Sequence, residues 1–169
     1  MLRLEIPNTS HEKEYNEMIK EWSLIENIGK TSPWALFYGK DYNEFLNLLE
    51  LYREWKKEWS VPSTLYFLIE WEKILWWIDI RHNIEHPYLR DYSGHIWYGI
   101  RPSERRKSYA TKMLELWLKE AKKLGIEKVL ICCYEDNIGS KKTILSNWWI
   151  FERNYEKDWK ISNRYWITL

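Results

Sequence analysis

The sequence predicts an α/β (α+β) fold with a mixed, mostly antiparallel central sheet and helices on both faces. The expected order of elements is β-α-α-β-β-β-α-β-α-β-β along 169 residues. Short alternating or β-branched segments mark the strands, and apolar residues at helical spacing mark the helices. Adjacent strand pairs favour antiparallel hairpins, whereas the alternation of helix and strand in the second half favours a partly parallel sheet. This length suits a single domain over residues 1–169.

The first half of the chain predicts one strand and two helices. Residues 2–6 alternate apolar and polar side chains, which indicates a short strand. Residues 8–10 (Asn-Thr-Ser) can cap a helix over about 10–23. Residues 24–40 carry glycine and proline turn signals, and the apolar spacing over about 41–59 indicates a second helix.

The middle of the chain predicts three strands. Residues 64–70 and 73–81 are rich in β-branched and aromatic side chains and are typical of a hairpin. Residues 82–93 form a polar segment, which we expect to be a loop, and residues 95–101 form the third strand.

The C-terminal part predicts two helices, a buried strand and a closing hairpin. The first helix follows the segment Arg101–Lys107 and should stop near Gly125, since glycine favours the left-handed position past a helix end. Residues 128–134 are apolar and short, as in a central buried strand. Asp136 or Asn137 can cap a second helix ending near residue 147, and residues 150–169 indicate the hairpin.

Composition limits the class of protein. The net charge is +1, so no global field favours nucleic acid or an anionic membrane. No apolar run approaches the ~20 residues of a membrane helix, and the first residues resemble a strand more than a signal peptide. Cys132 and Cys133 are adjacent, which suits neither an ordinary disulfide nor a spaced metal site. These observations favour the cytoplasm and no metal.

A basic segment between a predicted strand and a predicted helix indicates an anion site. Arg105, Arg106 and Lys107 lie there, just before the helix begins. Free backbone N–H groups and the helix dipole favour negative charge at such a position. A solvated charge run is the alternative reading of an isolated tripeptide, but its placement favours a phosphate or pyrophosphate ligand.

The residues Arg105-Arg-Lys-Ser-Tyr-Ala110 resemble the acetyl-coenzyme A signature of the GNAT acetyltransferases, Gln/Arg-x-x-Gly-x-Gly/Ala. They fit at the first and last positions, and Ser108 stands where the family has glycine. The order of elements is also that of the GNAT fold. The resemblance implies acetyl-coenzyme A as co-substrate, with the pyrophosphate on the loop, the pantetheine arm along the preceding strand, and an oxyanion site near Ile100. The implied coenzyme-binding residues in these two segments are Tyr98, Gly99, Ile100, Arg101, Arg105, Arg106, Lys107, Ser108, Tyr109 and Ala110.

A second segment, Asp136–Lys142, resembles the Asn-x-x-Ala/Ser element of the same family. By analogy Asn137 would bind the coenzyme arm, Ser140 would lie near it, and Lys141 or Lys142 would reach a ribose phosphate. Simple capping by Asn137 is an equally good reading. Many GNAT enzymes have a tyrosine seven residues after this asparagine, which acts as the general acid that protonates the leaving thiolate. This sequence has Ile144 at that position, so Ser140 or water would have to supply the proton.

The general base is sought among residues of the central strands and the loop after them. Transfer to an amine needs a base that deprotonates the ammonium. The candidates are Glu70, Asp79, His82 and Glu85, and His82 is favoured by its intrinsic pKa. No covalent nucleophile is indicated, because the two cysteines fit a buried strand.

The sequence therefore predicts an N-acetyltransferase in which an amine attacks acetyl-coenzyme A directly. The acceptor is a small-molecule amine or a peptide amine, and no nucleic acid or membrane partner is expected. Two alternatives remain: a coenzyme-binding GNAT domain without turnover, motivated by Ser108 and Ile144, and an aromatic-rich nucleic-acid-binding module.

Several tryptophans occupy positions in predicted turns or after helix ends, where the backbone conformation favours glycine. Trp71 and Trp159 fall in predicted hairpin turns, and Trp148 and Trp149 follow a helix end. In the resembling GNAT sequences, glycine is common at these positions and at Trp76 and Trp97. The hypothesis is that a UGA codon meaning glycine has been translated as tryptophan. The alternative is a lineage that uses tryptophan here.

Overall fold

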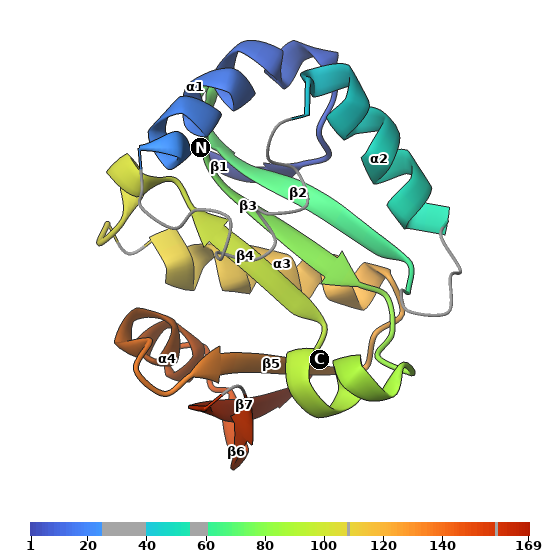
Figure 1. The fold of residues 1–169 in the computed structure, drawn as a ribbon, viewed down its shortest axis with the longest axis vertical. Helices are drawn as coiled ribbons and strands as arrows, with labels where there is room; N and C mark the ends of the chain where they lie inside the picture. Colours follow the sequence, from blue (N-terminus) through green and yellow to red (C-terminus); the bar gives the residue numbers. More distant parts are fainter. Residues whose placement is uncertain (25–39, 55–60, 108, 158) are drawn as a thin grey trace. The chain divides into compact units, whose positions relative to one another are not determined.

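The computed structural model describes residues 1–24, 40–54, 61–107, 109–157 and 159–169 (Figure 1). Two compact units are distinguished within the chain, each made of several segments: residues 1–56, 62–80 and 97–107 form the first, and residues 57–61, 81–96 and 108–169 the second. The helices are α1 (Glu12–Ser23), α2 (Tyr42–Glu54), α3 (Tyr109–Lys123) and α4 (Ile138–Leu145). The strands are β1 (Leu2–Glu5), β2 (Ser63–Glu70), β3 (Lys73–Arg81), β4 (Ile96–Ile100), β5 (Lys128–Tyr134), β6 (Ile150–Lys157) and β7 (Lys160–Thr168).

The first unit is built on a four-stranded sheet in the order β1-β2-β3-β4. Strand β1 pairs antiparallel with β2, so that Leu2 lies opposite Glu70. A two-residue loop joins β2 to β3, which confirms the predicted hairpin. At its far end β4 is fixed to β3 by the Arg101 N–H, which donates to the Leu75 carbonyl at 3.0 Å.

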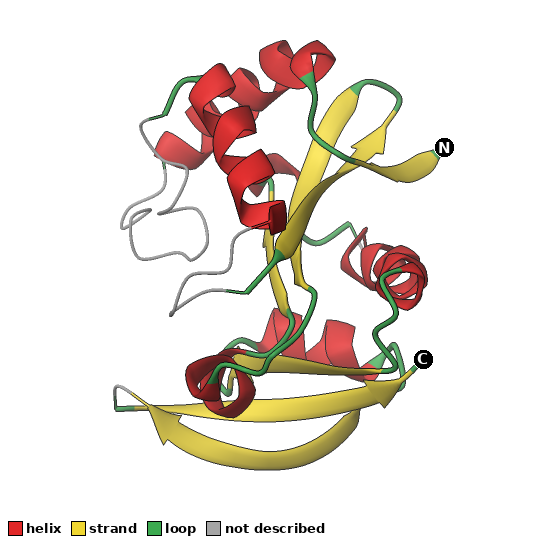
Figure 2. Cartoon of the chain, turned by 90° about the vertical axis from the view of Figure 1, so that its right-hand side faces the viewer, coloured by secondary structure: helices red, strands yellow, loops and turns green. Residues whose placement is uncertain are grey.

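Helices α1 and α2 pack on this sheet through an aromatic core (Figure 2). Tyr15 of α1 stacks on Phe45 of α2 with ring centroids 4.6 Å apart, and Phe45 stacks on Phe67 of β2 at 6.1 Å. All three rings are buried. Asn8 begins the helical segment as predicted, since its side chain accepts from the Ser10 N–H at 3.0 Å.

The second unit contains a three-stranded antiparallel sheet in the order β5-β7-β6. The predicted closing hairpin is confirmed as β6 and β7. The expectation that residues 128–134 form the central strand is wrong for this sheet, because β7 lies between β5 and β6. Strand β5 is nevertheless buried, as its apolar sequence predicts, and Gly94 makes an antiparallel bridge with Ile131.

Helices α3 and α4 end and begin with the expected capping residues. Gly125 has a φ of 77°; its N–H donates to the Lys122 carbonyl, and the Ile126 N–H donates to Ala121, both at 3.1 Å. This is the Schellman arrangement that glycine favours. Asn137 caps α4 by accepting from the Ser140 N–H at 3.1 Å. The capping interpretation of Asn137 is therefore confirmed.

The predicted polar loop over residues 82–93 is wrong in its second half, where a short π-helix spans Leu89–Ser93. The Gly94 N–H closes it by donating to the Leu89 carbonyl at 2.7 Å. The guanidinium of Arg164 on β7 donates to the carbonyls of Arg90 and Asp91 at 2.5 and 2.8 Å. A contact across 73 or more residues stabilises this turn, and local sequence carries no sign of it.

The turn signals of residues 25–39 and the end of the second predicted helix at 55–59 lie outside the described residues. Within the described part of the chain, no helix is long and apolar enough to span a bilayer.

Candidate functional site

Strand β4 is the last strand of the four-stranded sheet, and the predicted coenzyme-arm residues Tyr98, Gly99 and Ile100 belong to it. In an antiparallel ladder, alternate residues direct their N–H and C=O groups to the partner strand. Because the Arg101 N–H points to Leu75 on β3, the N–H of Ile100 points to the opposite side, away from β3. The backbone at Ile100 is thus oriented for pairing with an extended ligand along the sheet edge.

Gly99 has a packing role inside the sheet. A Cβ atom at this position would lie 2.7 Å from the indole of Trp77 on β3, so only glycine lets that ring lie across β4. On β4, Tyr98 stacks on Trp76, with ring centroids 5.9 Å apart. The aromatic neighbours of β4 therefore fix the strand that the resemblance assigns to the coenzyme arm.

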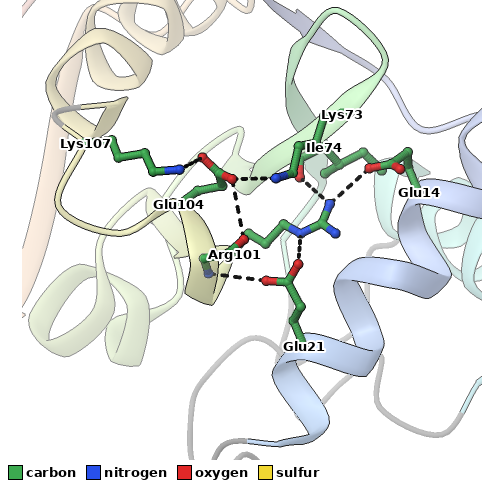
Figure 3. Close-up of polar contacts among 8 residues, drawn as sticks. Glu14, Glu21, Lys73, Ile74, Arg101, Glu104 and Lys107 are labelled. Carbon is green, nitrogen blue, oxygen red and sulfur yellow. Dashed lines mark hydrogen bonds and ion pairs between the residues drawn. The ribbon is translucent and has the colours of Figure 1, made fainter.

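Arg101 ties the end of β4 to helix α1 (Figure 3). Its Nε–H donates to Glu21 Oε1 at 2.6 Å, and its Nη1 donates to Glu14 Oε2 at 3.0 Å and to the Ile74 carbonyl at 3.1 Å. The guanidinium is buried, so these acceptors supply the hydrogen bonds that water does not. The Nε and Nη1 donors of Arg101 thus bind protein oxygens and give the residue a structural role, while its predicted contact with the coenzyme stays a prediction.

Glu21 reaches one residue further and holds the start of the basic segment. The Ser103 N–H donates to its second carboxylate oxygen at 3.2 Å. Burial raises the pKa of Glu21, but hydrogen bonds from Ser103 and Arg101 outweigh that effect and leave the pKa below its usual range. The ionised carboxylate therefore connects α1 to both ends of the turn that leaves β4.

Glu104 holds two lysines on a buried carboxylate (Figure 3). Lys73 Nζ lies 2.6 Å from Oε1, and Lys107 Nζ lies 2.9 Å from Oε2. Burial raises the pKa of Glu104, yet the hydrogen bonds from the two lysines prevail and lower the pKa overall. Lys107, predicted to bind phosphate, is thus neutralised in part by Glu104 and helps to shape the loop.

The remaining cations of the segment differ in their surroundings. The guanidinium of Arg105 lies over the ring of Trp22 on α1, 5.3 Å from its centroid. Arg106 is exposed and has a φ of 64°, in the left-handed region. A reversal of the backbone at Arg106 suits a loop that directs N–H groups to an anion. Ser108, the next predicted ligand, lies outside the described residues.

Helix α3 begins at Tyr109, directly after that segment in the chain. Its first turn contains no acidic residue, and Tyr109 and Ala110 are half-buried. The first N–H groups of a helix have no partner within the helix, and the dipole adds partial positive charge there. The α3 N-terminus therefore retains the electrostatics that the sequence predicts for an anion site.

In the second predicted motif, Asp136–Lys142, the Asn137 side chain caps the N-terminus of α4. Asn137 is the cap, and the backbone of Ser140 is its donor. A hydrogen bond from Ser140 lowers the pKa of Cys133, but burial is the larger effect and raises that pKa to about 11. Lys141 lies in the first turn of α4.

The two leading base candidates lie at opposite ends of β3. Glu70 ends β2 beside the turn into β3, whereas His82 follows the last residue of β3. Asp79 lies within β3, and Glu85 follows in the turn region after His82. Burial lowers the pKa of His82, so its imidazole is neutral at pH 7 and can accept a proton.

Sequence reasoning missed Glu21 and Glu104. Nothing near Glu21 in the chain marks it, because its partners Arg101 and Ser103 lie 80 or more residues away. Glu104 could have been noticed as an acidic residue inside a basic segment. In the parts of the chain that the structure describes, no cluster of His, Cys, Asp and Glu could hold a metal ion.

Comparison with known families matches residues 75–147 to the acetyltransferase (GNAT) domain. The matched range includes β4, the basic segment, α3 and α4. A comparison of the sequence with curated proteins gave no match.

Solved structures share the fold over nearly the whole chain. The microcin C7 self-immunity acetyltransferase MccE, in complex with acetyl-CoA and AMP, superposes with a TM-score of 0.72 at 18% identity, covering 99% of this chain and 92% of that one. The ribosomal L7/L12 alpha-N-protein acetyltransferase RimL, in complex with coenzyme A, gives 0.69 at 13% identity, with 99% and 94% covered. A chimera of spermidine N-acetyltransferase SpeG from Vibrio cholerae and hSSAT gives 0.64 at 12% identity, with 99% and 95% covered.

Proposed function

We propose that this chain is a GNAT acetyltransferase, which transfers an acetyl group from acetyl-coenzyme A to an amine by direct attack in a ternary complex. The observation that carries the proposal is the basic segment between β4 and α3. That segment is held in place by the carboxylates of half-buried Glu21 and buried Glu104, and it leads into a helix N-terminus without acidic residues.

In this proposal the coenzyme is bound mainly by backbone groups. The pyrophosphate would be bound by N–H groups of residues 105–110, and Arg106 would add an exposed positive charge to the same segment. The pantetheine arm pairs with the outward-facing backbone of Ile100 on β4. Gly99 contributes by keeping β4 close to β3, since Trp77 occupies the space of a side chain there.

The reaction needs one proton acceptor and one group that stabilises an oxyanion. A base removes the proton of the ammonium, and the free amine then attacks the thioester carbonyl carbon. Negative charge develops on the carbonyl oxygen, where a backbone N–H such as that of Ile100 would stabilise it. The tetrahedral intermediate collapses to the amide, and coenzyme A leaves as the thiolate, which takes up a proton from water or Ser140.

His82 is the proposed base. Burial lowers the pKa of its imidazole, which makes the neutral, accepting form dominant at pH 7. Glu70 is the second candidate. A limb of the pH dependence of kcat/KM that is governed by His82 would fall as the pH drops below about 6.5, and it should remain in Glu70→Gln but be lost in His82→Gln.

The similar structures do not agree on one class of acceptor amine. Those relatives carry names that refer to microcin immunity, a ribosomal protein N-terminus and spermidine. We propose a small-molecule or peptide amine, and one domain spanning residues 1–169, because the similar structures cover 99% of the chain. We also propose the cytoplasm as the compartment, since Cys132 and Cys133 are free thiols.

Thermal unfolding with coenzyme ligands tests the proposal. Acetyl-coenzyme A at 100 times its dissociation constant should add about 2.7 kcal/mol of stability. For a chain of this size that corresponds to a rise in Tm of roughly 5–10 °C. Adenosine should act only weakly, because it lacks the pyrophosphate. No shift with millimolar acetyl-coenzyme A would contradict the proposal.

Turnover is then measured as release of free coenzyme A thiol with a panel of amines: polyamines, amino acids, aminoacyl nucleotides and peptides with free N-termini. Amine-dependent release identifies the acceptor class. Binding without release for any amine would favour the alternative of a coenzyme-binding domain that does not turn over.

A further inference from the structure

Four described residues other than glycine have a positive φ, and three of them are tryptophans. The φ angles are 56° at Trp71, 59° at Trp148 and 61° at Trp159; the fourth residue is Arg106. In this region the Cβ of an L-residue crowds the backbone, so glycine occupies it routinely and asparagine or aspartate occasionally. For a bulky side chain it is a clear outlier.

Two of these tryptophans lie in tight hairpin turns. Trp71 is the first residue of the two-residue loop between β2 and β3, and Trp159 is the second residue of the loop between β6 and β7. Two-residue hairpin loops use turn types with positive φ, and glycine is the favoured residue there. Strands β6 and β7 stay paired up to their turn, where Lys157 lies opposite Lys160, so the pairing of the strands requires a tight turn there.

Trp148 repeats at the end of α4 what Gly125 does at the end of α3. The Gly125 N–H donates to Lys122, three residues back, at 3.1 Å, and the Trp148 N–H donates to Leu145, also three residues back, at 3.2 Å. Gly125 has a φ of 77° and Trp148 a φ of 59°. A left-handed residue with this hydrogen bond thus follows a helix end once as glycine and once as tryptophan.

The tryptophan side chains contribute no packing energy that would offset the cost of this backbone conformation. Trp71, Trp148 and Trp159 are 78%, 84% and 95% exposed, so their indoles lie in solvent and bury little area. The composition is skewed in the same direction, with 13 tryptophans and only 6 glycines in 169 residues. Glycine ordinarily makes up about 7% of a protein, which would be roughly 12 residues here.

We propose that Trp71, Trp148 and Trp159 stand at glycine positions, and that the cell which owns this gene reads their UGA codons as glycine. Read under a code in which UGA means tryptophan, the same codons give the sequence above. The inference rests on backbone geometry and does not depend on the acetyltransferase activity.

The other three tryptophans of the hypothesis have no positive φ. Trp76 and Trp149 are buried, and Trp149 packs on Trp117 with ring centroids 6.3 Å apart; Trp97 is half-buried in β4. The backbone at Trp149 therefore gives no reason to expect that glycine there would raise stability. For these three positions only the codon, UGA or UGG, can test whether glycine is the natural residue.

Reading the gene is the first test. The proposal expects UGA at positions 71, 148 and 159 and UGG at Trp117, which is a fully buried helix residue. UGG at any of the three turn positions would overturn it there. Peptide mass spectrometry of the protein from its own cells should then find glycine, and tryptophan in those peptides would overturn the glycine assignment.

Stability is the second test and needs only recombinant protein. Trp71→Gly, Trp148→Gly and Trp159→Gly should each raise Tm by about 2–4 °C. The matched alanine variants, which remove the indole but keep the Cβ, should raise it little. Trp166→Gly is the control, since Trp166 lies within strand β7 and has no positive φ, and it should lower Tm. If the glycine variants are no more stable than the alanine variants, the backbone conformation at these positions does not favour glycine, and the proposal is wrong.

Discussion

His95 shows how a single buried side chain makes the fold sensitive to pH. The backbone N–H of His95 donates to the Leu130 carbonyl at 2.8 Å, and the imidazole Nδ1 of His95 accepts from the Leu130 N–H at 3.0 Å. Burial lowers the pKa of His95 to about 4, and the neighbouring charge of Arg81 acts in the same direction. The imidazole is therefore neutral in the folded protein and joins the segment before β4 to β5.

We predict that stability falls as the pH drops from about 6.5 to 4. Over this range the unfolded chain takes up a proton on His95 while the folded chain does not, so protons favour unfolding. The contribution is about 3 kcal/mol, complete above pH 6.5 and lost by about pH 4. Urea unfolding at several pH values measures it.

His95→Asn is the matching variant, because its side-chain oxygen can still accept from Leu130 but does not titrate in this range. Its stability should change less between pH 6.5 and 4 than that of the parent. Equal pH dependence in both proteins would show that other groups are responsible.

Ala110 tests the anion site at the start of α3. Ala110→Asp places a carboxylate beside the proposed phosphate position, where like charges repel. We expect acetyl-coenzyme A affinity to fall at least 10-fold, measured by calorimetry, while the Tm without ligand changes little because Ala110 is only half-buried. Ala110→Asn has nearly the same size without the charge and should lose much less; similar losses in both would point to a steric cause.

At the scale of elements, the contact between α1 and the exit of β4 stands out. One carboxylate, Glu21, accepts from the Arg101 side chain and the Ser103 backbone and so fixes the first turn of the basic segment. The proposed coenzyme loop is therefore positioned by a helix that itself need not touch the ligand.

Glu21→Ala should loosen this junction. We expect a loss of about 2 kcal/mol in unfolding free energy, since a buried guanidinium keeps only Glu14 and the Ile74 carbonyl. Affinity for acetyl-coenzyme A should weaken several-fold in the same variant. Glu17→Ala, on the same helix but paired only with exposed Lys20, is the control and should leave both quantities unchanged. Unchanged coenzyme affinity in Glu21→Ala would separate the junction from the binding loop.

At the scale of the whole molecule, the reaction path follows from the thiols that the fold contains. Burial raises the pKa of Cys132 and of Cys133 to about 11, so at pH 7 both are protonated thiols and poor nucleophiles. A path through an acetylated cysteine is therefore disfavoured, and both substrates should be bound when the acetyl group moves.

We predict intersecting lines in double-reciprocal plots when both substrates are varied, and no acetylated protein in intact-mass spectra after incubation with acetyl-coenzyme A alone. Cys133→Ser should retain the same kinetic pattern. Parallel lines, or a stoichiometric mass increase of one acetyl group, would instead indicate a covalent intermediate.

Local sequence determined most of the helices and strands, and it alone predicts an anion site in the basic segment. Periodicity located β2, β3 and α3 to within a residue or two, Gly125 and Asn137 marked the helix ends, and the basic segment before α3 indicated the anion site. Each of these depends on residues close together in the chain, where spacing alone fixes which backbone groups and side chains meet. The turns at Trp71, Trp148 and Trp159 belong here too, because the sequence predicted glycine geometry and the backbone has it.

Only the tertiary structure decided the contacts between distant segments. The hydrogen bonds from Arg101 to Glu21 and from Arg164 to the turn at Arg90 each join residues more than 70 positions apart. The placement of β7 between β5 and β6, the ion pair of Lys73 with Glu104, and the lowered pKa of His95 likewise depend on what the fold packs around each group. Burial and strand order are properties of the assembled sheet, so spacing along the chain does not encode them directly.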